Sequence, residues 1–352
     1  MAEIWNRYDV TAARPPRQPD ARKQRPQSRT VDIHSHAFVP AAEKFVVPHL
    51  RMHASGEAAE TTALNRKQND DRRSRLTTLD ERLGELDAMA IDVQLVKPAP
   101  HQCYYDLPTD IAVEAARLVN DGIAAFVARK PDRLVPMGTV PMTDGAAAAA
   151  ELERCIRDLH FKGVQILTNV VGRELSDPAF APFWAKAEAL GAFVVLHPMG
   201  FTEPKRFSRF YFNNVIGNPL DTMVAVHYLI FDGVLERHPN LKIMAVHGGG
   251  YLPAYSGRID HAWGARSDTH GTLPKPPSFY LRKFYFDTVV FTPHQLENLV
   301  RLFGAERILM GTDYPFDMGE YDPVGHVLSV DGFDEATVAA IAGGNAVKLL
   351  GL

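Results

Sequence analysis

Two histidines near the start of the chain have the spacing of paired metal ligands. The stretch TVDIHSHAFVP places His34 and His36 one residue apart at the end of a short apolar run. On a β-strand, residues i and i+2 point to the same face, so both imidazoles would lie side by side. This arrangement suits two ligands of one metal ion, but it also suits two polar residues that hydrogen-bond a loop. A single H-x-H pair does not decide between these alternatives.

Three more polar residues occupy comparable positions at the ends of apolar runs. His197 lies near the end of AFVVLHP, His247 follows LKIMAV, and Asp313 ends RILMGTD. Each has an ordinary alternative when taken alone: His197 as a buried core histidine, and the other two as caps of the turns that follow. A random scatter of 14 histidines would not be expected to place four of them at such ends. The recurrence therefore favours one shared site.

Eight strand-like runs alternate with helical patterns from residue 30 onward, and they provide the framework for such a site. The predicted strands are residues 30–34, 93–98, 134–140, 163–169, 192–198, 241–248, 284–290 and 307–313. Strands that alternate with helices indicate a parallel sheet, and eight such units indicate an α/β fold closed as a TIM (β/α)8 barrel. Catalytic residues of such barrels lie at the C-terminal ends of the strands. No G-x-G-x-x-G motif follows the first strand to favour an open dinucleotide-binding sheet.

A single divalent metal ion is the cofactor that this set of residues predicts. Three imidazoles and one carboxylate suit Zn²⁺ or a similar ion and leave one position open for water or substrate. The predicted ligands are His34, His36, His197 and Asp313. The fourth strand ends in QILTN, which supplies no lysine or carboxylate to bridge two metals. His247 is then free to act as a general acid or base.

The overall composition excludes several other classes of protein. The chain has 352 residues, of which 46% are hydrophobic and 23% charged, with a net charge of −4. This balance argues against a nucleic-acid-binding face, which would need a basic excess. No apolar run approaches the roughly 18 residues that span a membrane, and the N-terminus lacks the core of a signal peptide. We therefore expect a cytoplasmic protein whose two cysteines are reduced thiols.

The domain organisation is expected to be simple. Residues 1–30 are interrupted by charges and prolines and are predicted to form a poorly ordered N-terminal arm. Residues 31–352 are predicted to form one barrel domain. A charge-rich stretch at about residues 41–75 is too long for a plain connection, so we expect a lid-like insertion there.

The motifs DIHSH, LHP, HGGG, GRIDHAW and GTDYPF, in this order, resemble those of the amidohydrolase-related metal-dependent decarboxylases. The resemblance is strongest to the α-amino-β-carboxymuconate-ε-semialdehyde decarboxylases and extends over residues 31–352. It implies a distorted barrel of the amidohydrolase superfamily type, one Zn²⁺ (Mn²⁺ in some relatives), and the same four ligands. It also implies that His247 is the catalytic acid or base. Finally, it implies that Arg258 of GRIDH binds a substrate carboxylate, reaching into the neighbouring subunit's site of a homodimer.

Two departures from that resemblance concern the substrate. Met199 follows the fifth-strand HP, where the semialdehyde decarboxylases carry a tryptophan, and a softer wall there suggests a differently shaped substrate. The insertion at 41–75 matches poorly, and it should carry further cations for the substrate. The candidates are Arg66, Lys67, Arg72 and Arg73. We expect Met199, Phe316 and this insertion to set specificity.

The reaction favoured by these observations is the non-oxidative decarboxylation of an aromatic or unsaturated carboxylic acid. His247, or Asp313 from the metal's shell, would handle the proton that replaces the carboxyl group, and Arg258 would orient the substrate. The alternative is a hydrolase that uses a metal-activated water on an amide, a lactone or a C–C bond. A third alternative is a non-catalytic barrel with a structural metal, and it receives little weight because all the expected site residues are present.

Overall fold

Nine parallel strands surround the centre of the part of the chain that the structure describes. The computed structural model describes residues 25–26, 28–50 and 58–352. Most of the predicted N-terminal arm (1–24 and 27) and part of the predicted insertion (51–57) lie outside the described residues. The parallel strands are β1 (Val31–Ala37), β2 (Val93–Pro98), β3 (Leu134–Pro136), β4 (Gly138–Thr139), β5 (Gly163–Leu167), β8 (Phe193–His197), β9 (Lys242–Ala245), β10 (Tyr285–Asp287) and β11 (Ile308–Leu309).

The strands are divided between two sheets that together follow a circular order. One sheet has the order β1-β2-β3 and the other has the order β11-β10-β9-β8-β5-β4. Only Met137 separates β3 from β4, so these two short strands form one position that pairs with β2 in one sheet and β5 in the other. The nine parallel strands therefore occupy eight positions, and β6 (Asn169–Val170) and β7 (Arg173–Glu174) form a separate antiparallel pair.

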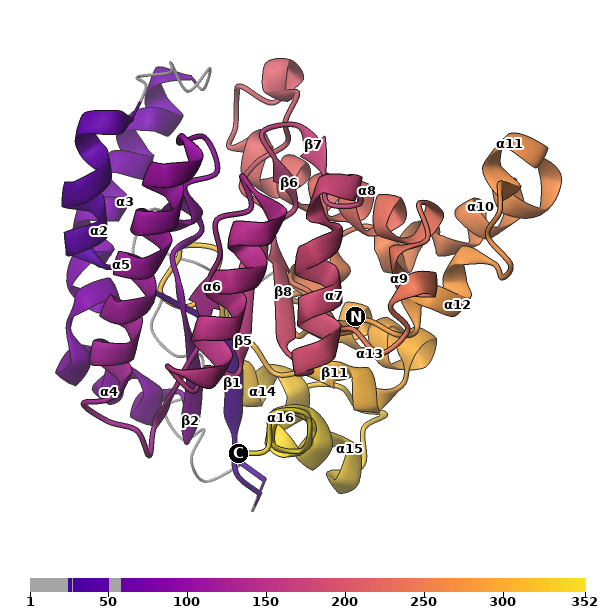
Figure 1. The fold of residues 1–352 in the computed structure, drawn as a ribbon. Coiled ribbons are helices and arrows are strands. Elements are labelled where there is room, and N and C mark those ends of the chain that lie inside the picture. Colours follow the sequence, from indigo (N-terminus) through magenta and orange to yellow (C-terminus); the bar gives the residue numbers. More distant parts are fainter. Residues whose placement is uncertain (1–24, 27, 51–57) are drawn as a thin grey trace.

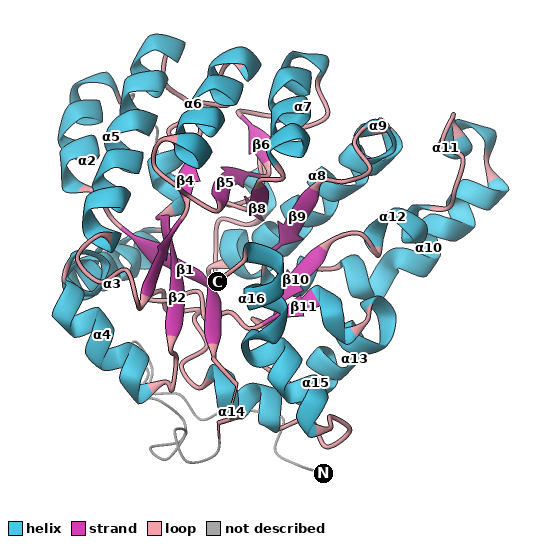
Figure 2. Ribbon diagram, turned by 60° about the horizontal axis from the view of Figure 1, so that its bottom comes forward, coloured by secondary structure: helices cyan, strands magenta, loops and turns pink. Residues whose placement is uncertain are grey.

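Hydrogen bonds between the first and last strands join the two sheets on the other side. Ile33 N donates to Met310 O at 2.9 Å, His36 N to Tyr314 O at 2.8 Å, and Asp313 N to His34 O at 2.8 Å. The eight positions thus follow one another around the ring, although the ladder is interrupted where the sheets meet. This arrangement is the predicted distorted barrel, seen along its strands in Figure 2.

Helices cover the outside of the ring and connect successive strands (Figures 1 and 2). They are α2 (Pro40–Val46), α3 (Ala59–Thr77), α4 (Leu79–Ala88), α5 (Thr109–Val127), α6 (Gly145–Arg157), α7 (Ala181–Leu190), α8 (Asn218–Phe231), α9 (Val234–Arg237), α10 (Leu252–Ala265), α11 (Ser267–His270), α12 (Pro277–Leu281), α13 (Pro293–Phe303), α14 (Pro323–Leu328), α15 (Glu335–Ala339) and α16 (Asn345–Leu350). In α13, Leu296, Leu299 and Phe303 are buried at the spacing of one helical face, which packs the helix against the barrel. Among the described residues, no helix combines the length and the apolar character that crossing a membrane requires.

Each predicted strand overlaps an observed strand, and several observed strands are shorter than the apolar runs that predicted them. The run 307–313 pairs with β10 only over Ile308–Leu309. Beyond Leu309 its backbone hydrogen-bonds β1, and Asp313 at its end adopts a left-handed backbone conformation with φ 60°.

Part of the predicted insertion is helical. All of α2 but its first residue and all of α3 but its last two residues lie within residues 41–75, and α3 packs beside β1. On the other side of the molecule, α10 and α11 project away from the barrel (Figure 1). These two outlying regions, α3 and the α10–α11 projection, are relevant to the substrate and to the proposed assembly discussed below.

Candidate metal centre

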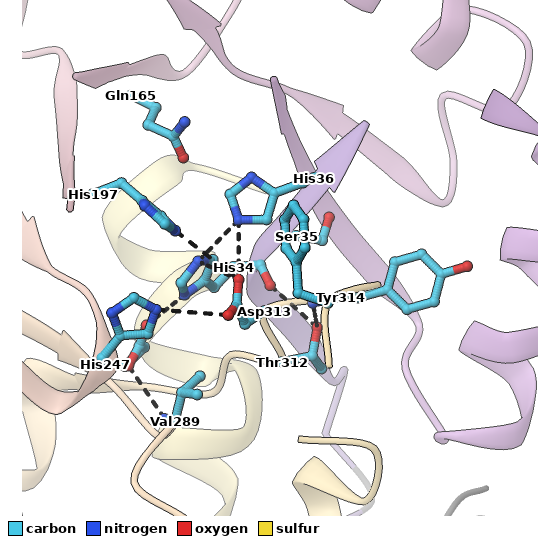
Figure 3. Close-up of polar contacts among 12 residues, drawn as sticks. His34, Ser35, His36, Gln165, His197, His247, Val289, Thr312, Asp313 and Tyr314 are labelled. Atoms are coloured by element: carbon cyan, nitrogen blue, oxygen red, sulfur yellow. Dashed lines mark hydrogen bonds and ion pairs between the residues drawn. The ribbon is translucent and has the colours of Figure 1, made fainter. Parts of the chain in front are cut away.

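Four side chains from three strand ends meet at one point of the barrel. His34 and His36 come from β1, His197 is the last residue of β8, and Asp313 follows β11. Their nearest ligand atoms all lie within 4.8 Å of one another, and all four residues are buried. Figure 3 shows the three imidazoles and the carboxylate facing one another. The structure therefore brings together the four predicted ligands.

Hydrogen bonds fix which nitrogen each of the three histidines presents to the centre. The Nδ1 of His34 lies 2.6 Å from Asp287 Oδ2, that of His36 lies 3.0 Å from the Pro98 carbonyl oxygen, and that of His197 lies 2.7 Å from the Pro198 carbonyl oxygen. Because carbonyl and carboxylate oxygens only accept, each Nδ1 carries the hydrogen. Each Nε2 is therefore left with its lone pair, which is the form that binds a metal.

The distances between the inward-facing atoms suit ligands of a single ion. His34 Nε2 and His36 Nε2 are 3.2 Å apart, and Asp313 Oδ1 lies 3.2 Å from the first and 3.1 Å from the second. His197 Nε2 is buried and has no hydrogen-bond partner among the described residues. A cation at this point would satisfy that orphaned nitrogen. The donor set of three nitrogens and one carboxylate fits a divalent ion of the zinc type.

The electrostatics of the cluster also favour the metal-binding protonation states. Burial lowers the pKa of His36 to about 3 and that of His197 well below its usual value. Burial and Lys97 act to lower the pKa of His34, but the carboxylates of Asp313 and Asp287 raise it on balance. Burial alone would raise the pKa of Asp313, yet the surrounding histidines hold it well below its usual range. The group is thus a carboxylate amid mainly neutral imidazoles.

His247 lies beside this group without belonging to it. Its Nε2 is 3.6 Å from Asp313 Oδ2, and its ring centroid lies 5.2 Å from that of His197. The side chain is 18% exposed and lines a pocket of about 650 Å³. The predicted acid or base therefore borders the pocket and lies outside the group of four predicted ligands.

Left-handed backbone conformations aim His247 and Asp313 into the site. Their φ angles are 56° and 60°, a region that non-glycine residues seldom adopt and that is concentrated at functional sites. The three glycines after His247 also have positive φ angles. A Cβ on Gly248 would lie 2.2 Å from Val290 Cγ1, and one on Gly250 would lie 2.5 Å from the Pro219 carbonyl oxygen. The HGGG turn thus needs glycine because protein atoms pack closely around it.

Asp287 is a site residue that was not predicted, although it lies at the end of β10 and the strand-end rule applies to it. One carboxylate oxygen, Oδ2, binds His34 Nδ1, and the other accepts the backbone N–H groups of Gly248 at 2.8 Å and Val289 at 3.2 Å. Asp287 therefore fixes the position of His34, one of the predicted metal ligands, and of the turn that carries His247. Carboxylates in this position orient a histidine ligand and raise its basicity.

We expect Asp287→Asn to weaken metal binding by about 10- to 100-fold. An asparagine has one acceptor oxygen, so its amide would face an N–H group on either His34 or Gly248. Titration of the metal against a chelator measures the effect. Asp334→Asn is the matched control, because Asp334 caps the distant helix α15 and asparagine caps equally well. Wild-type affinity in Asp287→Asn would contradict the assigned role.

Lys97 is the second unpredicted residue, and its charge is buried beside the cluster. Lys97 is the second-to-last residue of β2. It pairs in register with His36 of β1, so the two side chains lie on the same face of the sheet. The side chain is fully buried, and Nζ has no hydrogen-bond partner among the described residues. Burial lowers the pKa of Lys97 to about 8, although the carboxylates of Asp313, Asp287 and Asp32 oppose that shift.

We expect Lys97→Met to bind the divalent ion at least about tenfold more tightly, or about 1.4 kcal/mol. Methionine retains a long unbranched chain but removes a positive charge that repels the ion. The same chelator titration measures the change, with the exposed Lys130 changed to methionine as the control. Unchanged or weaker binding would show that the ammonium group does not oppose the ion.

The pocket next to the metal centre contains some of the predicted substrate-binding residues. Met199 and Phe316 both line it, and Met199 is 55% exposed. Of the four basic candidates in the insertion, Arg72 lines the pocket from α3, whereas the other three are exposed and are not among its lining residues. Arg258 is exposed on α10 and does not line the pocket of its own chain.

Comparisons with known proteins agree with this geometry. The profile of the amidohydrolase family matches residues 31–352. The 2-amino-3-carboxymuconate-6-semialdehyde decarboxylase of Dictyostelium discoideum is 37% identical over 274 residues, which are 78% of this chain and 76% of that protein. The γ-resorcylate decarboxylase of Rhizobium radiobacter is 30% identical over 255 residues, which are 68% of this chain and 77% of that protein.

Solved structures give the same answer for the fold. The 5-carboxyvanillate decarboxylase of Sphingomonas paucimobilis superposes with a TM-score of 0.83 at 24% identity, covering 93% of this chain and all of that one. The dihydroxybenzoic acid decarboxylase of a Polaromonas species, solved with manganese and 2-nitroresorcinol, gives 0.77 at 25% identity, covering 93% and 98%. The predicted fold, the family resemblance and the prediction of a metal-dependent carboxy-lyase are confirmed. This chain belongs to the amidohydrolase family, among relatives that are decarboxylases.

Proposed function

We propose that this protein catalyses the metal-dependent, non-oxidative decarboxylation of an aromatic or unsaturated carboxylic acid. The observation that carries the proposal is the buried cluster of three histidines and an aspartate, with His247 facing the adjoining pocket. Zn²⁺ suits this donor set, and Mn²⁺ is the alternative because the Polaromonas relative was solved with manganese. His34, His36, His197 and Asp313 would hold the ion.

The reaction breaks the bond to the carboxyl carbon, leaves its electron pair on the substrate, and adds a proton at the same carbon. When bound, the metal supplies positive charge that orients a substrate oxygen and stabilises the developing negative charge. His247 delivers the proton because its ring borders the pocket. Asp313 Oδ2 lies 3.6 Å from His247 Nε2, so the carboxylate is close enough to exchange a proton with that ring and shares the acid–base role.

Pocket residues other than the metal ligands bind the body of the acid. The Arg72 guanidinium lies 5.0 Å from the ring centroid of Phe316 and 3.2 Å from Asp317 Oδ1. Its partners hold it in place on one wall. Met199 forms an apolar and adaptable wall beside His197. These residues suit a planar acid that lies between an aromatic ring and a thioether.

The remaining substrate contact comes from a second copy of the chain. Arg258 is exposed on the projecting helix α10 and does not line the pocket of its own chain. Tyr255 is also exposed on α10, and Phe279 is exposed on α12. We propose a homodimer in which Arg258 of each chain binds a substrate carboxylate at its partner's site. Light scattering gives the mass, and a mixture of Arg258→Ala and His247→Asn chains that regains activity would support shared sites.

Incubation of the metal-loaded protein with candidate acids tests the proposed reaction. The panel contains 2-amino-3-carboxymuconate-6-semialdehyde, 2,6-dihydroxybenzoate, 6-methylsalicylate and 5-carboxyvanillate. In ²H₂O, a decarboxylase releases one CO₂ per substrate and incorporates one deuterium at the carbon that lost the carboxyl group. Consumption of substrate with ¹⁸O from water in the product and no CO₂ would establish the hydrolase instead.

A further inference from the structure

A pair of asparagines forms part of the pocket wall and takes no part in the metal centre. Asn213 begins the π-helical segment η5 (Asn213–Gly217), and Asn218 is the first residue of α8. Both side chains line the 650 Å³ pocket, together with His247 and Asp313. The proposed chemistry uses neither side chain, and the contacts of the two amide groups indicate a different role.

Backbone hydrogen bonds determine which way the two amides face. Phe201 N donates to Asn213 Oδ1 at 2.9 Å, and Gly200 N donates to Asn218 Oδ1 at 2.6 Å. A backbone N–H can bind only the oxygen of an amide, so the position of each NH₂ group follows from chemistry. In the described part of the chain, neither Nδ2 has a hydrogen-bond acceptor. Each NH₂ group therefore keeps its donor hydrogens without an acceptor among the described residues, on a side chain that lines the pocket.

Two glycines enclose Asn213 so closely that its amide has little freedom. A Cβ on Gly200 would lie 2.4 Å from Asn213 Nδ2, and a Cβ on Gly217 would lie 2.8 Å from Asn213 Oδ1. Gly200 also has a φ of 83°, a left-handed conformation that favours glycine. The loop after β8 therefore positions both amides before any ligand arrives. Donors that are already positioned bind an acceptor with less loss of entropy.

The charge of the wall indicates which acceptor it takes. A primary amide is a neutral donor, whereas a desolvated carboxylate needs a cation to compensate its charge. Among the described lining residues, Arg72 is the only arginine or lysine, and it is already paired with Asp317. Neutral oxygen acceptors therefore match the part of the wall that the two asparagines form better than a carboxylate does, since a substrate carboxylate is assigned to Arg258 of a second chain.

We propose that Asn213 and Asn218 bind a neutral oxygen acceptor of the substrate, such as a carbonyl, hydroxyl or ether oxygen. The acceptor lies on the ring or chain outside the carboxyl group that leaves. This inference rests on the proposed function, because it assigns the substrate's second recognition group. It makes the two asparagines determinants of specificity, distinct from the residues that carry the reaction.

Matched acids and isosteric variants test this proposal. The probes are pairs of substrate acids that differ only in a methoxy group against an ethyl group. Asn213→Asp and Asn218→Asp keep the oxygen that accepts the backbone N–H and replace the donor NH₂ with an acceptor oxygen. Asn214→Asp is the control, because Asn214 also lines the pocket but its side-chain oxygen accepts no backbone N–H among the described residues. All three variants add the same charge to the pocket.

We expect the wild type to prefer the methoxy acid in kcat/KM by at least tenfold. Asn213→Asp and Asn218→Asp should bring that ratio to one or below, and Asn214→Asp should leave it unchanged. A wild-type ratio of one would overturn the proposal. An equal loss in Asn214→Asp would also overturn it, because charge alone would then explain the effect.

Equilibrium binding separates this proposal from the proposed function. If the wild type releases no CO₂ from any acid, the proposed function fails. Calorimetric titration of the same acid pairs into the metal-loaded proteins then measures the preference for the methoxy acid over the ethyl acid as a ratio of Kd values. The ratio is measured for the wild type and for each of the three variants. A methoxy preference that both aspartate variants abolish would support the asparagine site even then, and equal Kd values in the wild type would refute it.

Discussion

Replacing His247 by asparagine is expected to lower kcat/KM by about 10²- to 10⁴-fold while the metal content stays at the wild-type value. An amide cannot deliver or remove a proton near neutral pH, so the acid–base step is lost. His247 is outside the group of four ligand residues, and its ring borders the pocket. The variant therefore separates proton transfer from metal binding.

The backbone makes asparagine a suitable replacement at this position. His247 has a φ of 56°, and asparagine adopts the left-handed region more readily than most residues. Structural damage is thus a poor explanation for any loss of activity. Metal analysis, kcat/KM and the melting temperature are measured on the same preparation. The exposed His294, changed to asparagine, is the control and should keep full activity. Full turnover by His247→Asn would remove that residue from its assigned role.

The metal centre was the part of the site most readily predicted from sequence. His34 and His36 obey the period of two along a strand, and His197 and Asp313 obey the rule that polar residues at strand ends face the active side of a barrel. Both rules concern backbone geometry, which short apolar runs reveal. The same rule applied to every strand would also have found Asp287, the last residue of β10, and Lys97, the second-to-last residue of β2.

The rest of the site depends on loops, whose geometry the sequence pattern does not reveal. The roles of Asn213 and Asn218 follow from hydrogen bonds to Gly200 and Phe201, twelve to eighteen residues away. Only the structure shows that Val290 and Pro219 crowd the glycines of the HGGG turn. The role of Arg258 cannot be seen in a single chain, because the substrate that it is proposed to bind lies in the site of a second chain.

Asp313→Asn is expected to lower kcat/KM by at least about 10²-fold even when the metal site is saturated. The change removes the one carboxylate of the ligand group, so metal affinity should also fall by at least about tenfold. The fold should survive, because the backbone N–H of residue 313 still donates to His34 O and asparagine accepts a φ of 60°.

Saturation with metal decides between the two roles assigned to Asp313. If the carboxylate were only a ligand, excess Zn²⁺ or Mn²⁺ would restore full turnover to Asp313→Asn. If it also acts on the proton through His247, whose Nε2 lies 3.6 Å from Oδ2, the deficit persists at full occupancy. Asp287→Asn is the matched comparison, since it weakens the site through His34, does not touch Asp313, and keeps one oxygen for the Gly248 N–H in the turn that carries His247. Its activity should recover with added metal, so a persistent deficit confined to Asp313→Asn would identify the carboxylate that serves both metal and proton.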